Sequence, residues 1–121
     1  MTADDLRTAC LALPGARENG CSSRAPDLST FKVLGKVFAL SRFAGEEPLR
    51  VSLKCEPELA VGLREAHAAI LPGYHLDKRH WNTVLLDGSL PDRMVVEMIE
   101  DSYDLVVAKL PKSRQRRLRA S

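Results

Sequence analysis

"TFKVLGKVFALSRF", residues 30–43, predicts a β-hairpin at the centre of the fold. Two runs with β-branched and aromatic residues, at 31–34 and 37–42, flank Gly35. Glycine readily adopts the positive φ that a tight hairpin turn requires. Residues 49–54, "LRVSLK", then alternate apolar and polar side chains. This alternation is typical of a half-buried strand in an antiparallel sheet.

Helical patterns surround these strands, and we expect three helices, at residues 3–13, 57–69 and 90–109. The last has the clearest pattern, because its apolar residues recur with a 3.6-residue period. Ser102 interrupts this seam, and Ser89 is a potential N-cap of the helix.

The order of elements favours an α+β domain rather than a parallel α/β fold. A further strand is expected at 82–86, and residues 16–30 are interpreted as loop, with room for a short strand starting near Arg17. Helices before, between and after a meander of strands predict an antiparallel sheet with three helices packed mainly on one face. The uncovered face would then carry basic side chains, namely Lys32, Arg50 and Lys54.

Length and charge indicate one domain with a distinct C-terminal segment. The chain has 121 residues, and we interpret 1–111 as a single domain and 112–121 as a basic tail. Residues 1–108 carry 12 bases and 16 acids, a net charge of −4, whereas the segment from Lys109 onward carries six bases and no acid. We expect a cytoplasmic protein that is not membrane-bound, because no membrane-spanning run or signal-peptide pattern occurs, and a monomer is favoured.

The segment "GYHLDKRHWNTV", residues 73–84, concentrates chemically versatile side chains. A metal site is disfavoured: His75 and His80 are five residues apart, which separates them on a helix or a strand. Lys78 and Arg79 beside them would also repel a cation. The odd number of cysteines, widely spaced, gives no metal or disulfide pattern, and we expect no cofactor.

Catalysis has no complete signature in this chain, and we assign no catalytic residue. A Cys–His pair between Cys55 or Cys21 and one of these histidines is formally possible, but sequence spacing does not test it. The enzyme class therefore stays open and disfavoured.

A basic and aromatic binding surface fits the residue types of this segment best. Lysine and arginine suit phosphate, and the rings of tyrosine, histidine and tryptophan suit stacking on bases. A core role for Trp81 is the alternative, since the side-chain alternation of the 82–86 strand leaves its direction open. The candidate binding residues are Lys32, Arg50, Lys54, Tyr74, His75, Lys78, Arg79, His80 and Trp81.

Four stretches, in this order, resemble the MmcQ/YjbR-like family of small bacterial proteins: "FKVLGKVFAL", "VSLKCEPELA", "PGYHLDKRHWNTVLLDGSLPD" and "MIEDSYDLVVAKLP". The resemblance runs from about residue 2 to 111 and is most specific over 73–92. It implies a compact α+β fold similar to that of the frataxin homologue CyaY. Members are commonly labelled DNA-binding. An aromatic–glycine pair that is usual soon after the first helix is missing here, where the chain reads "ENGCSSRAPDLSTF".

Two functional hypotheses follow. The preferred one is a non-enzymatic protein that binds DNA or another nucleic acid with low sequence specificity. The alternative is a small-molecule or protein-interaction module, with a pocket lined by Tyr74, His75, Lys78, His80 and Trp81. Rings that converge in one pocket would favour the ligand module, and rings spread over a flat basic face would favour nucleic acid.

Overall fold

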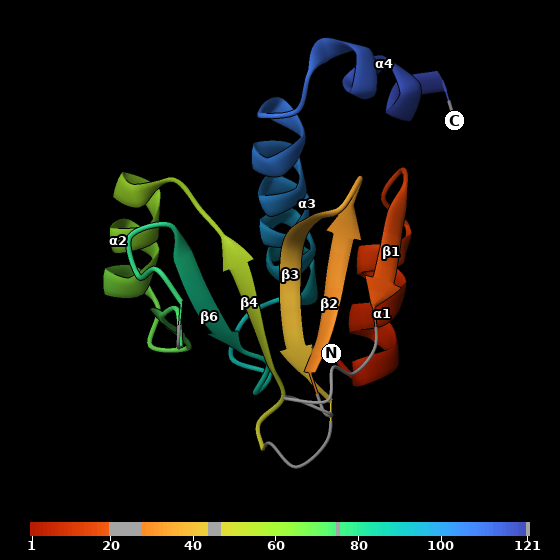
Figure 1. Cartoon of the computed structure of the whole chain (residues 1–121). Helices are drawn as coiled ribbons and strands as arrows, with labels where there is room; N and C mark the ends of the chain where they lie inside the picture. Colours follow the sequence, from red (N-terminus) through yellow and green to blue (C-terminus); the bar gives the residue numbers. More distant parts are fainter. Residues whose placement is uncertain (20–27, 44–46, 75, 121) are drawn as a thin grey trace.

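The computed structural model describes residues 1–19, 28–43, 47–74 and 76–120. Its centre is a six-stranded antiparallel sheet with the strand order β1-β2-β3-β4-β6-β5 (Figure 1). The predicted α+β fold with an antiparallel sheet is therefore confirmed. In chain order the strands are β1 (Ala16–Asn19), β2 (Leu28–Val33), β3 (Lys36–Arg42), β4 (Arg50–Lys54), β5 (Ile70–Pro72) and β6 (Trp81–Leu85).

The central hairpin forms as the sequence predicts. Its two turn residues, Leu34 and Gly35, have φ angles of 47° and 81°. Positive φ at both central positions is the signature of the I′ turn, whose twist matches that of the paired strands. The register shifts between Phe31 and Lys32, which pair with Ala39 and Val37, so Phe38 is the extra residue of a bulge on β3. The turn therefore fixes β2 and β3 side by side, and the bulge bends the pair.

The structure has four helices in its described part, so the expectation of three was wrong. They are α1 (Ala3–Leu11), α2 (Pro57–Ala66), α3 (Asp92–Ala108) and α4 (Lys112–Ala120). Figure 1 shows α3 behind the centre of the sheet, α2 beside the β6 end and α1 beside the β1 end. In the described residues, no helix is both long enough and apolar enough to cross a membrane.

Helix α4 is the basic segment that the sequence indicated as a tail. Pro111 follows the end of α3 by three residues, and its carbonyl accepts the first α4 hydrogen bonds, from Arg114 and Gln115. Leu118 is 7% exposed and belongs to the main core cluster. A single apolar residue in a run of bases shows no periodicity, so the sequence pattern did not reveal this packing.

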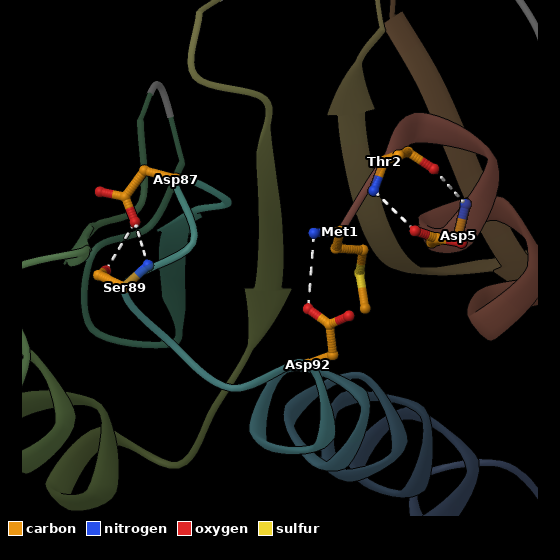
Figure 2. Close-up of polar contacts among 6 residues, drawn as sticks. All are labelled: Met1, Thr2, Asp5, Asp87, Ser89 and Asp92. Carbon is orange, nitrogen blue, oxygen red and sulfur yellow. Dashed lines mark hydrogen bonds and ion pairs between the residues drawn. The ribbon is translucent and has the colours of Figure 1, made fainter.

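The starts of α1 and α3 are capped differently (Figure 2). Thr2 caps α1 with a full capping box: Asp5 N donates to Thr2 Oγ1 at 3.1 Å, and Thr2 N donates to Asp5 Oδ2 at 2.9 Å. Ser89 does not cap α3; its backbone N and its hydroxyl both donate to Asp87 Oδ1 instead. The N-cap of α3 is Pro91, which offers no side-chain hydrogen bond.

The polar interruption in the α3 seam holds two strands in place. Ser102 is fully buried, donates to Phe38 O at 2.6 Å and accepts from Lys54 N at 2.8 Å. β3 and β4 pair directly only at Ala39–Leu53 and Leu40–Ser52. Beyond these pairs the strands diverge, as Figure 1 shows, and the Ser102 hydroxyl replaces a ladder hydrogen bond between them.

Candidate functional site

The sheet has one face covered by helices and one open face. On β4, Val51 and Leu53 are buried, whereas Arg50, Ser52 and Lys54 are half-buried on the opposite side. The register pairs these three with Leu85, Thr83 and Trp81 of β6, which places the Trp81 side chain on the open face. This register decides the direction that the sequence left open.

Acids and bases are distributed unevenly over the elements. Nine of the sixteen acids lie on α1, α2 and α3, which together carry three bases, whereas α4 carries five bases and no acid. Glu18 of β1 faces α1, where it accepts from Arg7 Nε at 3.0 Å. The charged side chains that the described strands place on the open face are all basic: Arg17, Lys32, Arg42, Arg50 and Lys54.

A shallow cavity of about 200 Å³ lies on the open face where β3 ends and β4 begins. Arg42 and Arg50 provide its basic side, and Tyr74 lies on its rim with 63% of the residue exposed. The remaining lining is largely apolar or hydroxylic: Leu28, Leu40, Ser41, Ser52, Leu76 and Thr83.

A second cavity, of about 430 Å³, lies at the other end of β4, where β3 and β4 diverge. We name it the β3–β4 notch. Lys54 Nζ is 5.8 Å from the centroid of the Trp81 ring, which is within cation–π range. The β3–β4 notch is lined by residues from three strands and from the C-terminal end of α3: Lys36, Val37, Lys54, Trp81, Val106, Lys109 and Leu110.

The loop before β6 forms a separate environment. Asp77 organises it, since its side chain accepts from Arg79 N at 3.0 Å and lies 2.7 Å from His80 Nδ1. The hydrogen bond with His80 is the main cause that lowers the pKa of Asp77. His80 is therefore engaged in shaping the loop, while Lys78 and Arg79 line a hollow against α2.

The structure thus distributes the predicted site residues over several places. Tyr74 joins Arg50 in one cavity, and Trp81 joins Lys54 in another, so the two rings do not converge. Lys32 lies on the open face between them and the β1 edge. His75 lies outside the described residues.

Sequence reasoning missed three basic residues of these cavities. Arg42, the last residue of β3, lines the cavity on the open face. Lys36, directly after the hairpin turn, and Lys109, directly after α3, line the notch. Only the divergence of β3 from β4 brings Lys36 and Lys109 to one cavity. The sole signal in the sequence was the polar Ser102 in an apolar seam.

The described cysteines are not activated as nucleophiles. Burial raises the pKa of the Cys10 thiol to about 12. Burial also raises the pKa of Cys55, whose backbone N donates to His80 O at 2.8 Å. The other cysteine of the open Cys–His hypothesis, Cys21, lies outside the described residues. Among those described, no three His, Cys, Asp or Glu side chains are grouped as metal ligands.

Comparisons with known proteins place this fold in a bacterial family. The YjbR family model matches residues 11–105. The YjbR protein of Escherichia coli K12 is 38% identical over 118 residues, covering 98% of both chains, and YbdF of E. coli O157:H7 is 33% identical over 82% of this chain and 80% of its own.

Solved structures agree with this assignment. A crystal structure of Deinococcus radiodurans protein DR2400, with a DUF419 domain, is similar with a TM-score of 0.88 and 41% identity, covering 97% of this chain and 87% of its own. A Pseudomonas syringae protein is similar with a TM-score of 0.73 and 29% identity, over 87% and 98% of the two chains. The family model matches most of the chain, and the E. coli K12 protein aligns with 98% of it, so the chain belongs to the YjbR family.

Proposed function

We propose that this protein binds single-stranded nucleic acid, without catalysis and with low sequence specificity, across the open face of its sheet. The observation that supports the proposal is the distribution of charge: the open face presents Arg17, Lys32, Arg42, Arg50 and Lys54, while acids outnumber bases by nine to three on α1, α2 and α3. The net charge of −4 over residues 1–108 therefore does not describe the surface that would meet a polyanion.

A single strand suits this surface better than a duplex. Major-groove readers insert a helix or a two-stranded ribbon into the DNA, whereas single strands lie across open sheets and stack their bases on aromatic side chains. Tyr74 lines the basic cavity on this face, and Trp81, whose side chain is also on this face, lines the notch at the opposite end of β4. Arg50 and Lys54 are separated by about 13 Å at the rise of an extended strand, a span of about four stacked nucleotides.

The alternative ligand module receives less support from the geometry. Its pocket needed Tyr74, His75, Lys78, His80 and Trp81 to converge. The four of these residues that the structure describes lie in different environments. Lys78 and Arg79 remain a second candidate contact for phosphate, because both are exposed beside α2. The similarity to CyaY stays a prediction and plays no part in the proposal.

The test is a salt titration of binding to labelled 20-mer single-stranded DNA, single-stranded RNA and duplex DNA, followed by fluorescence anisotropy. We expect single strands to bind more tightly than duplex. The logarithm of the binding constant should fall linearly with the logarithm of salt concentration, by about 0.7 per phosphate contact. Absence of binding to every probe at low salt would overturn the proposal.

Two matched double variants locate the contacts. Lys32→Ala/Arg42→Ala removes two bases from the open face, and Lys78→Ala/Arg79→Ala removes two from the hollow beside α2. We expect the first to reduce the salt slope by about 1.4 and the second to reduce it less. A larger effect of the loop variant would move the interface from the sheet to the α2 edge. Deleting residues 112–121 is unsuitable, because it removes the core residue Leu118.

A further inference from the structure

The β3–β4 notch is kept open by the fold itself. Ser102 donates to Phe38 O on β3 and accepts from Lys54 N on β4, so its hydroxyl bridges the two strands where they no longer pair directly. The α3–α4 junction closes one end, where Gln115 Nε2 donates to Leu110 O at 2.8 Å. The cavity therefore has walls from the sheet, α3 and their connection, rather than from mobile surface side chains alone.

Three lysines line this cavity. Lys36 comes from the start of β3, Lys54 from the end of β4 and Lys109 from the end of α3. Within the described part of the chain, the ion pairs involve other residues, and none of these lysines is paired with a carboxylate. Like charges brought together raise the free energy of the folded state, and a bound anion would offset this repulsion.

The rest of the lining is apolar and includes one large ring. Val37, Val106 and Leu110 provide aliphatic walls, and Trp81 is half-buried with its ring near Lys54. A ligand that binds both the lysines and the apolar lining needs an anionic group for the lysines and a flat aromatic group for the Trp81 indole. A nucleotide, in which a sugar joins a phosphate to a nucleobase, has both the anionic and the aromatic group. The cavity volume of about 430 Å³ lies within the range of small-molecule sites.

We propose that the β3–β4 notch is a binding site for one nucleotide, with its phosphate on Lys36 and Lys109 and its base against Trp81. The inference rests on the proposed function and sharpens it, since Lys54 and Trp81 belong to both the notch and the open face. The nucleotide is either part of a strand that crosses the sheet or a free mononucleotide, and both present the same chemistry.

Trp81 is the single tryptophan of the chain, so its fluorescence reports on the notch directly. The probes are AMP, adenosine, inorganic phosphate and a single-stranded oligo(dA) 10-mer, each titrated at low salt. We expect AMP to quench Trp81 saturably, and adenosine and phosphate to bind at least about tenfold more weakly. Each lacks one of the two groups that the notch contacts.

Two variants with the same change of charge separate the notch from general electrostatics. Lys36→Ala/Lys109→Ala removes two exposed bases from the notch, and Arg93→Ala/Arg116→Ala removes two exposed bases that line neither the notch nor the open face. The first should weaken AMP binding about tenfold, and the second should leave it within about twofold of the parent. Thermal melts of both variants check that the fold is retained.

The outcomes distinguish the two proposals. If the 10-mer binds but the notch variant responds to AMP as the control variant does, the notch inference fails and the sheet-face function stands. If AMP binds through the notch and the 10-mer does not bind, the notch is a site for free nucleotides and the sheet-face function fails. If neither probe quenches or binds, both proposals fail.

Discussion

Ser102 Oγ accepts a hydrogen bond from Lys54 N at 2.8 Å, and this bond joins α3 to the end of β4. The same hydroxyl donates to Phe38 O on β3 at 2.6 Å. One small polar side chain thus satisfies two backbone groups where the sheet ladder is interrupted. The polar break in the α3 seam therefore lies where β3 and β4 diverge.

Ser102→Ala should destabilise the protein by about 1–3 kcal/mol, because it leaves a buried donor and a buried acceptor without their partner. Chemical denaturation followed by circular dichroism measures the change. Ser113→Ala, at an exposed position on α4, is the matched control and should stay within about 0.5 kcal/mol. Equal effects of the two substitutions would show that Ser102 does not bridge the strands.

Gly15→Ala should destabilise α4 packing and the whole fold. Gly15 has φ 71°, and an added Cβ would lie 2.5 Å from Leu118 Cδ2. Gly88→Ala is the control, since Gly88 has φ 88° but nothing within 4 Å of the added Cβ. Both substitutions strain the backbone by about 1–3 kcal/mol, and only the first adds a clash. We expect a larger loss of thermal stability in Gly15→Ala; the reverse order would contradict the docking of α4.

The capping box of α1 predicts a pH dependence. The bonds that Asp5 forms with Thr2, the backbone bond first, lower the pKa of the Asp5 carboxyl below its ordinary 3.8. A lowered pKa contributes stability above the unfolded-state pKa, and this contribution is lost as pH falls through the folded-state value.

Asp5→Asn should therefore melt below the parent at pH 6, and the difference should shrink toward pH 2. Asp4→Asn, in the same first turn, controls for the helix dipole. A difference in melting temperature that is the same at both pH values would show that the Asp5 charge is not involved.

The thiols should be slow to alkylate in the folded protein. Burial raises the pKa of Cys10 to about 12 and raises that of Cys55, so little thiolate is present at pH 8. Iodoacetamide labelling followed by peptide mass spectrometry should find Cys10 unmodified in the native state, and Cys55 labelled more slowly than in denaturant. Faster labelling of native Cys55 than of the denatured thiol would restore the Cys–His enzyme hypothesis.

Local chemistry determined much of this fold from the sequence. Gly35 between two β-rich runs predicts the hairpin, the alternation of residues 49–54 predicts β4, and the periodic seam predicts α3. These features depend on neighbours within one turn or one strand pair, so the pattern is sufficient. The basic residues of β4 could be placed on the uncovered face for the same reason.

Only the tertiary structure decided how distant residues combine. The register of β4 with β6 set the direction of Trp81, and the divergence of β3 from β4 placed Lys36 and Lys109 around one cavity. Leu118 is one apolar residue among bases, and its burial depends on Gly15, at the other end of the chain. Such pairings depend on contacts between segments far apart in sequence, and no local period of side chains records them.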